Sequence, residues 1–210
     1  MAAIRSATTV VASTLCPEIR LHSNPDFEAV WAQLSAVSDA VNPNPPYWAH
    51  PWPGGQALAR YILDNPAVTR GRRVLDIGSG SGICAIAAAI AGAAAIEAID
   101  TDPWAVDAMT INARLNRVKL IVRAIDFSHA GDTEDVVLAG DLWYERFFAR
   151  SITTHLLGLA RRGKTVLMGD CGRAHFPRDQ VQCLAVYPLT ASPIFDAAGP
   201  VAGRVFSMLR

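Results

Sequence analysis

Val74-Leu75-Asp76-Ile77-Gly78-Ser79-Gly80-Ser81-Gly82 is the stretch of sequence that decides the fold of this chain. β-Prone apolar residues lead to an acidic residue, and three glycines follow at alternate positions before an alanine-rich run over 83–89. This order predicts a strand, a tight glycine turn and the start of a helix. Glycine has no Cβ and tolerates positive φ, so such a turn lets the backbone come within contact distance of a bound nucleoside.

The spacing of the glycines and the position of the acid indicate which nucleoside the turn would bind. The spacing is G-x-G-x-G, whereas dinucleotide sites use G-x-G-x-x-G. S-Adenosylmethionine has no pyrophosphate, and its cationic methionine end needs a carboxylate. A plain strand–helix connection is the alternative for the turn taken alone. We predict that S-adenosylmethionine contacts the strand end and the turn, at Asp76, Gly78, Ser79, Gly80 and Gly82.

A second predicted strand also ends in an acidic residue. Residues 94–100 read as a short strand ending in Asp100, which lies 18 positions after Gly82. In nucleoside-binding α/β sheets, a carboxylate at an offset of roughly 20 residues meets the ribose hydroxyls. Asp102 precedes a proline that begins another helix, and we interpret it mainly as a helix cap.

A third predicted strand, over 120–125, ends in Asp126 and Phe127. This pair suits the adenine of the cofactor, because the carboxylate accepts from its amino group and the aromatic ring contacts its edge. Acidic residues at several successive strand ends indicate a binding site more strongly than a single acidic residue does. We therefore assign Asp126 and Phe127 to cofactor binding.

The composition limits the classes of function. The 210 residues are 51% hydrophobic and carry 19 basic and 19 acidic side chains, so the chain can bury a full core as one domain with a short extension. Zero net charge argues against a nucleic-acid binder that neutralises phosphates. No stretch approaches the roughly 20 apolar residues of a membrane span. We expect neither a nucleic-acid partner nor a membrane partner.

The four cysteines, Cys16, Cys84, Cys171 and Cys183, form no C-x-x-C pair and have no histidine at ligand spacing. We expect no metal and no disulfide framework, and interpret them as core residues or idle thiols in a reducing compartment. Residues 1–15 faintly resemble a transit peptide, with one arginine and no acid. The expected location is cytoplasmic, with the mitochondrial matrix as the alternative.

The N-terminal part is predicted to be an extension of the main domain. Residues 25–38 favour one amphipathic helix, and 41–47 read as a rigid proline-rich linker. A further helix is expected over 55–63. We place the extension at 1–44 and an S-adenosylmethionine-dependent methyltransferase domain at 45–210.

From residue 73 onward the pattern alternates strand and helix, which predicts a parallel sheet with ligands at the carboxyl ends of its strands. The last two strands, 181–189 and 202–209, are joined through 193–200 without a helical stretch, so an antiparallel hairpin is expected at the sheet edge. This finish resembles the Rossmann-like, seven-stranded class I methyltransferase fold, an α/β architecture. The other predicted strands lie near 73–78, 95–100, 120–125, 135–140 and 164–169, and the helices near 83–91, 103–114 and 146–160.

The end of the fourth strand should carry the chemistry, because it faces the pocket beside the first strand. Ala139 is expected to leave room for the cofactor. The strand leads into Asp141-Leu142-Trp143-Tyr144-Glu145, which brings together two carboxylates, a phenol and aromatic faces that can hold a cation. The alternative is that one of the acids caps the next helix and the tryptophan is core. We predict three catalytic residues: Asp141, Tyr144 and Glu145.

The stretch 47–56 combines three aromatic residues with prolines and paired glycines. We expect it to form no regular element and to fold over the pocket as a lid, with Trp48 and Trp52 against the cofactor; simple packing is the alternative. The preceding Asn44-Pro45-Pro46-Tyr47 spells a tetrapeptide of amino-group DNA methyltransferases. No apolar strand precedes it here, so we interpret it as part of the linker.

Six stretches resemble the electron transfer flavoprotein β-subunit lysine methyltransferases, a family of seven-β-strand protein-lysine methyltransferases. The glycine motif is common to all class I methyltransferases, whereas Trp-Pro-Gly-Gly and Asp-Leu-Trp-Tyr-Glu are much narrower signals. Where this chain has Phe127, many relatives have tryptophan. The similarity covers roughly residues 15–175, and the stretches are 46–49, 52–58, 61–66, 74–80, 140–145 and 169–173.

The resemblance implies methyl transfer from S-adenosylmethionine to lysine side chains of the flavoprotein's β subunit. The residues agree with an amine acceptor, since a dry aromatic pocket lowers the pKa of a lysine and a carboxylate such as Asp141 orients the amine. Two other readings stay open at this point. One is a small-molecule or ribosomal-protein N-methyltransferase of the same fold, and the other is a non-catalytic nucleoside-binding scaffold, against which Asp141 and Glu145 speak.

Overall fold

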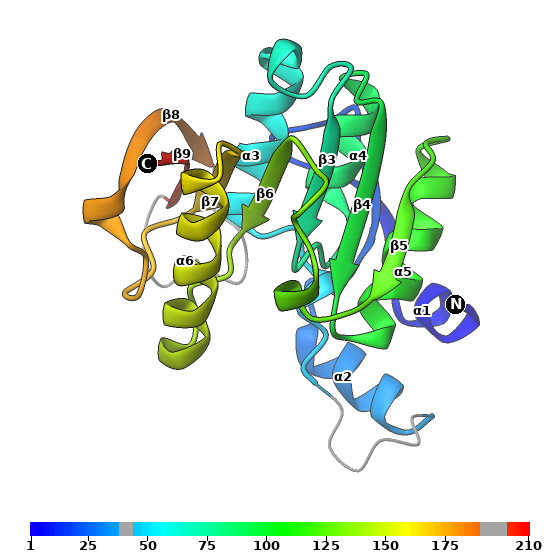
Figure 1. The fold of residues 1–210 in the computed structure, drawn as a ribbon. Coiled ribbons are helices and arrows are strands. Elements are labelled where there is room, and N and C mark those ends of the chain that lie inside the picture. The colour runs from blue at the N-terminus through cyan, green and yellow to red at the C-terminus, as the bar shows by residue number, and fades with distance from the viewer. Residues whose placement is uncertain (38–43, 190–200) are drawn as a thin grey trace.

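The structure is a computed structural model that describes residues 1–37, 44–189 and 201–210. Its centre is a seven-stranded sheet in the order β5-β4-β3-β6-β7-β9-β8 (Figure 1). Strands β3 to β7 pair in parallel, whereas β9 is antiparallel to both of its neighbours. The strands are β3 (Arg73–Ile77), β4 (Ala95–Asp100), β5 (Ile121–Ala124), β6 (Val136–Gly140), β7 (Thr165–Asp170), β8 (Val181–Leu189) and β9 (Val201–Met208).

This sheet confirms the predicted class I methyltransferase fold. Each predicted strand is present, with ends that differ by at most one residue from the expected bounds. The C-terminal hairpin is also confirmed, with β8 at the sheet edge and β9 inserted between β8 and β7. The expected connection over 193–200 and residues 41–43 of the expected linker lie outside the described residues.

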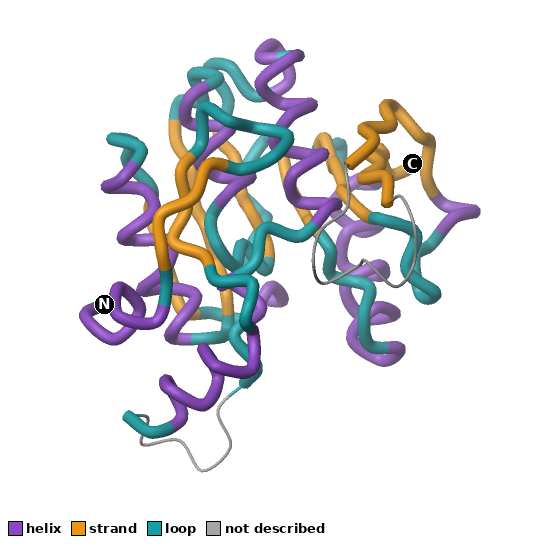
Figure 2. The backbone as a smooth tube through the Cα atoms, turned by 180° about the vertical axis from the view of Figure 1, so that it is seen from behind, coloured by secondary structure: helices purple, strands orange, loops and turns teal. Residues whose placement is uncertain are grey.

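Helices cover both faces of the sheet, as Figure 2 shows from behind. Successive side chains of a strand point to opposite faces, so Val74 packs with α3 (Pro53–Asp64) and α4 (Ile83–Ile90), whereas Leu75 packs with α6 (Arg146–Arg161). Burying such a side chain stabilises the fold by about 1.5–3 kcal/mol. In the part of the chain that the structure describes, no helix is long and apolar enough to cross a membrane.

The N-terminal extension contains more structure than the single helix expected. It begins with α1 (Ala2–Ala7), continues through the antiparallel pair β1 (Thr9–Ala12) and β2 (Arg20–Ser23), and ends with α2 (Phe27–Ser35). Helix α2 starts at Asp26, whose side chain accepts from the Ala29 N–H. Buried side chains of α1, α2 and α5 (Pro103–Leu115) share one cluster, so the extension packs against the main domain.

Helix α3 begins earlier than predicted because its first turn lies directly on the sheet. A Cβ at Gly169 in β7 would clash with the carbonyl group of Gly54, and one at Gly203 in β9 would clash with that of Pro53. Glycine is therefore required on both sides of the contact. The expected irregular lid over 47–56 is wrong for residues 47–49, which form a short 3-10 helix, and for residues 53–56, which form this buried turn.

Candidate active site

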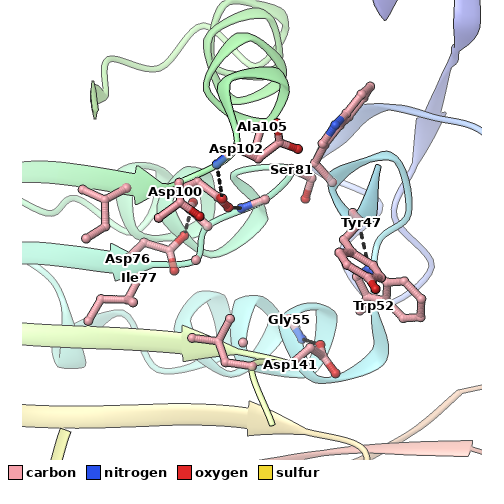
Figure 3. Close-up of a pocket in the computed structure, with 18 of the residues that line it drawn as sticks. Tyr47, Trp52, Gly55, Asp76, Ile77, Ser81, Asp100, Asp102, Ala105 and Asp141 are labelled. Carbon is pink, nitrogen blue, oxygen red and sulfur yellow. Dashed lines mark hydrogen bonds between the residues drawn. The ribbon is translucent and has the colours of Figure 1, made fainter. Parts of the chain in front are cut away.

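A cavity of about 740 Å³ opens at the carboxyl ends of the central strands. Its walls come from the glycine turn after β3, the end of β4, residues 125–127, residues 140–144 and the short helix Tyr47–Ala49. Figure 3 shows Asp76 and Asp100 on one side of it and Asp141 beside Gly55 on another. Open α/β sheets bind ligands at this edge, and the volume is typical of a small-molecule site.

The glycine turn adopts the conformation that its sequence predicts. Gly78, Gly80 and Gly82 have φ values of 58°, 54° and 84°, which side chains with a Cβ rarely adopt. Residues 78–81 line the cavity, but Gly82 does not. Gly82 is the N-cap of α4, where an added Cβ would lie 3.4 Å from the Met109 side chain. The predicted cofactor contact of Gly82 is therefore replaced by a structural role.

Asp76 lies at the end of β3 with only 1% of its surface exposed. Its Oδ2 atom accepts from Ser79 Oγ at 2.5 Å and from the Ala85 N–H at 3.1 Å. Burial raises the pKa of Asp76 from 3.8 to about 7, and these hydrogen bonds oppose the shift. Asp76 lines the cavity, so a buried carboxylate that titrates near neutrality faces any bound ligand.

Asp100, at the end of β4, connects two loops of the site. One carboxylate oxygen accepts from the Gly80 N–H and the other from the Asp102 N–H, each at 3.0 Å. Burial raises the pKa of Asp100. Asp102 is the N-cap of α5, where it accepts from the Trp104 N–H at 2.9 Å, so the predicted cap is confirmed. Both carboxylates also line the cavity.

The predicted adenine pair lies at the far end of the cavity. Asp126 and Phe127 both line it, and the Asp126 side chain caps the short helix Phe127–His129 by accepting from the Ser128 N–H at 2.9 Å. The Phe127 ring meets the Phe148 ring edge-on, with centroids 5.8 Å apart. Ala139 is fully buried in the core and does not line the cavity. Its predicted place at the cofactor is taken by the next residue, Gly140.

The aromatic residues of 47–52 form one wall of the cavity. Trp52 donates its indole N–H to the Tyr47 carbonyl oxygen at 2.7 Å, and the Tyr47 ring centroid lies 5.3 Å from that of Tyr144. Trp48 is only 2% exposed and packs in the N-terminal cluster while also lining the cavity. Its buried indole N–H has no hydrogen-bond partner among the described residues. Trp48 is thus a core residue with one side toward the site.

Asp141 is held by three contacts at the end of β6. Its φ of 61° is unusual for a residue with a side chain, and its N–H donates to the Gly169 carbonyl oxygen at 2.8 Å. Oδ2 accepts from the Gly55 N–H at 2.6 Å, and Oδ1 pairs with the Arg173 guanidinium. Burial raises the pKa of Asp141 from 3.8 to about 6, although Arg173 opposes the rise.

Sequence reasoning assigned no function to Arg173, which lies at the centre of the site. Asp170, fully buried at the end of β7, accepts from the N–H groups of Gly172 and Arg173 at 2.6 and 2.7 Å and so fixes the loop. The Arg173 guanidinium lies 5.8 Å from the centre of the Trp52 ring. The signal in the sequence is one more acid at a strand end, Asp170, three residues before Arg173.

Of the two other predicted catalytic residues, one lines the cavity and one does not. Tyr144 lines the cavity, and burial raises the pKa of its phenol. Glu145 does not line it: its carboxylate accepts from the Phe147 and Phe148 N–H groups and caps α6. Glu145 therefore caps a helix, which is the alternative that the sequence left open, and its catalytic role stays a prediction. Trp143 is fully buried and donates its indole N–H to Thr153, which makes it core.

Another residue that the sequence did not single out is His50. It lines the cavity and meets the Trp52 ring edge-on at a centroid distance of 5.0 Å. Burial lowers the pKa of His50 to about 4, so the ring is neutral at pH 7. All four cysteines are free thiols. Within the described ranges, no group of three or more histidine, cysteine or acidic side chains is arranged to hold a metal ion.

Comparison with known proteins shows that this chain is similar to methyltransferases in sequence and in fold. Residues 56–142 match the family model of ribosomal protein L11 methyltransferase. A crystal structure of magnesium protoporphyrin IX methyltransferase from Synechocystis PCC 6803, solved with bound S-adenosylmethionine, superposes with a TM-score of 0.55. It shares 15% identity over 73% of this chain and 77% of that chain, so the likeness concerns the fold alone.

Two vertebrate proteins are similar over most of the chain. The electron transfer flavoprotein β-subunit lysine methyltransferase of Mus musculus is 42% identical over 187 residues, which is 84% of this chain and 71% of that protein. The Xenopus laevis protein of the same name is 38% identical over 214 residues, covering 95% of this chain and 83% of its own length. In both alignments, the match extends well beyond the 87 residues of the family model.

Proposed function

The chain belongs to the family of electron transfer flavoprotein β-subunit lysine methyltransferases, and we propose that it transfers methyl groups from S-adenosylmethionine to lysine side chains of that flavoprotein's β subunit. The proposed substrate is the one given in the names of the relatives. The charges of the cavity supply the chemical reason for a positively charged donor and an amine acceptor.

The observation that carries the proposal is the excess of carboxylates around the cavity. Five aspartates line it, and Arg173 is the one lysine or arginine among the described lining residues. That guanidinium is already paired with Asp141 and Asp170. A cavity with this balance attracts cations. The proposed reaction brings two cations together, because the methyl donor is a sulfonium and a lysine arrives as an ammonium ion. The lining aspartates are Asp76, Asp100, Asp102, Asp126 and Asp141.

The residues present fit S-adenosylmethionine. The turn over 78–81 presents backbone without bulky side chains, Asp100 would accept from the ribose hydroxyls, and Asp76 would face the methionine end. The buried Trp48 N–H, which has no partner among the described residues, is suited to donate to a ligand. When bound, S-adenosylmethionine supplies a methyl group that is already activated on a sulfonium.

The other end of the cavity fits the acceptor. A lysine has a pKa of about 10.4 in water and must be neutral to act as a nucleophile. The aromatic side chains of Tyr47, Trp52 and Tyr144 line this end, and a lysine side chain inserted between them would lose water, which would lower its pKa by desolvation. Asp141 would hold the amine by a hydrogen bond and take up or relay its proton. Most of the acceleration then comes from positioning, which the three contacts of Asp141 secure.

The test is methylation of a defined protein. The purified chain is incubated with isotope-labelled S-adenosylmethionine and either the intact electron transfer flavoprotein or ribosomal protein L11, and lysine masses are read by mass spectrometry. We expect label on lysines of the flavoprotein β subunit. Label on L11 alone would contradict the proposal and would identify L11 as the substrate. The match of residues 56–142 to the L11 methyltransferase family is the reason for testing this protein. That matched region includes Asp141 but ends before Tyr144 and Arg173, so it covers only part of the acceptor side.

A further inference from the structure

The outer face of α6 forms one wall of a second hollow, of about 860 Å³, which we call the α6 groove. The helix residues that line it recur at spacings of three and four, so they form one continuous stripe along the helix. The opposite wall comes from the segment after β7. In Figure 1, α6 lies beside β7 on one face of the sheet. The groove is lined by Arg146, Phe147, Ala149, Arg150, Thr153, Thr154, Leu157, Gly158, Arg161, His175, Pro177 and Gln180.

The charge of the α6 groove has one sign. Arg146, Arg150 and Arg161 line it, are exposed, and form no ion pair with any described residue. Among the residues that the structure describes, no acidic side chain lines it. The nearest acid along the helix is Glu145, and its carboxylate accepts from two N–H groups of the first turn. Three guanidinium groups therefore remain available for carboxylates of another molecule.

An aromatic side chain joins the α6 groove to the rim of the active site. Phe147 lines the groove and is 80% exposed, which is costly for so large an apolar group. Its neighbour Phe148 lines the active-site cavity and stacks on Tyr144, with centroids 5.9 Å apart. The groove thus begins where the cavity opens, and a chain that enters one can continue along the other.

The length of α6 sets the size of the segment that would fit. Sixteen residues of α-helix extend about 24 Å, which an extended polypeptide covers with about seven residues. Arg146 and Arg150 are one turn apart, whereas Arg161 is three turns farther on. The cations are spread along a groove whose other lining residues are threonines and apolar side chains.

We propose that the α6 groove binds an acidic segment of the protein substrate, within about seven residues of the lysine that enters the active site. The proposal rests on the proposed function, because it assumes a protein acceptor. Carboxylates of the segment pair with the three arginines, and an apolar side chain covers Phe147. Spaced cations between apolar side chains suit a mixed acidic and apolar peptide better than a phosphate backbone, whose charges are closely and regularly spaced.

The first test compares charge-reversal variants of exposed arginines. Arg150→Glu and Arg161→Glu place like charges opposite the acidic segment, and Arg70→Glu is the matched control. Arg70 is exposed and precedes β3, at the opposite edge of the sheet from the cavity. With electron transfer flavoprotein as substrate, each groove variant should raise KM on the order of tenfold and leave kcat within about twofold. Circular dichroism and donor calorimetry should match the wild type. An unchanged KM in both groove variants would overturn the proposal.

The second test does not need methylation. A fluorescein-labelled decapeptide of aspartate, glutamate, leucine and phenylalanine is titrated with protein, and its anisotropy is followed at low salt. Wild type and Arg70→Glu should bind it, and the groove variants should bind at least tenfold more weakly. Equal binding by all four proteins would refute the acidic-peptide site. So would tight binding of a labelled 20-nucleotide RNA that the groove variants lose, because it would assign the groove to nucleic acid. If wild type fails to methylate the flavoprotein but binds the peptide, only the proposed function falls.

Discussion

Gly55 and Asp141 lie 86 positions apart in the chain and are joined by a hydrogen bond of 2.6 Å from the Gly55 N–H to Asp141 Oδ2. Trp52, the N-cap of α3, provides no side-chain hydrogen bond to the helix. Asp141 supplies the missing acceptor, and the positive end of the helix dipole favours its negative charge. The same carboxylate therefore holds α3 on the sheet and lines the cavity.

Asp141→Asn should separate chemistry from cofactor binding. The amide can still accept from Gly55 but carries no charge for the lysine amine. We expect the variant to fold and to bind S-adenosylmethionine within a few-fold of wild type, while methylation falls by about 10² or more. Calorimetry and mass spectrometry of the flavoprotein β subunit measure the two effects. Full activity would remove Asp141 from the catalytic role, and lost donor binding would move it into the cofactor site.

Asp100→Ala should weaken donor binding. Its loss removes charge-assisted hydrogen bonds to the ribose worth about 1.5–3 kcal/mol, which corresponds to at least about tenfold in affinity. Asp107→Ala is the matched control, because that partly exposed α5 carboxylate pairs with the N-terminus and does not line the cavity. Titration calorimetry on both folded variants decides the matter, and equal affinities would reject the ribose assignment.

Asp76 should make donor affinity depend on pH. Its pKa rises from 3.8 to about 7 through burial, and a cationic ligand requires the ionised form. Affinity should therefore rise from pH 6 to pH 8, with proton release that calorimetry detects in buffers of different ionisation enthalpy. Asp76→Asn should show a flat profile. A pH-independent affinity in the wild type would contradict the pairing of Asp76 with the methionine end.

The raised pKa of Asp76 should also make the stability of the unliganded protein depend on pH. A carboxyl group with a raised pKa in the folded state contributes stability that is full below pH 3.8 and is lost as the pH rises through about 7. Asp76 should therefore lower the melting temperature mainly between about pH 4 and pH 7, and Asp76→Asn should reduce that decline. Thermal scans of the two proteins across this range provide the comparison.

Trp48 and Trp52 should respond differently to truncation. Trp48 is 2% exposed, so Trp48→Ala should lower the free energy of unfolding by about 3–5 kcal/mol. Trp52 is partly exposed and contacts Tyr47 and Arg173, so Trp52→Ala should melt closer to the wild type and bind the donor more weakly. Donor addition should change the tryptophan fluorescence of the wild type. Equal melting temperatures for the two variants would show that Trp48 and Trp52 contribute equally to the stability of the fold.

Glu145→Ala tests whether Glu145, which caps α6, also takes part in the reaction. Removing the cap leaves two N–H groups of α6 without their acceptor, so the melting temperature should fall while kcat stays near the wild-type value. Thermal scanning and steady-state kinetics are measured on the same preparation. A large loss of kcat without a change in melting temperature would restore Glu145 to the reaction.

The sequence by itself determined the order of the elements and one half of the site. Alternating strand and helix patterns predict the parallel sheet, and the glycines after Asp76 permit only a tight turn at the end of the first strand of this sheet, β3. Asp100, Asp126 and Asp141 follow from the same local rule, since each ends or follows a strand and parallel strands present their carboxyl ends at one edge. These features depend on neighbours in the chain and are therefore visible in it.

Only the tertiary structure decided which side chains near the strand ends enter the cavity. Neighbouring residues of a strand face opposite sides of the sheet, so Ala139 is core and Gly140 lines the cavity although they are adjacent. The contact of Asp141 with Gly55 and Arg173 joins three segments that are distant in sequence. Whether an acid such as Glu145 caps a helix or meets a ligand depends on where the helix axis points, and the packing of α6 on the sheet sets that direction.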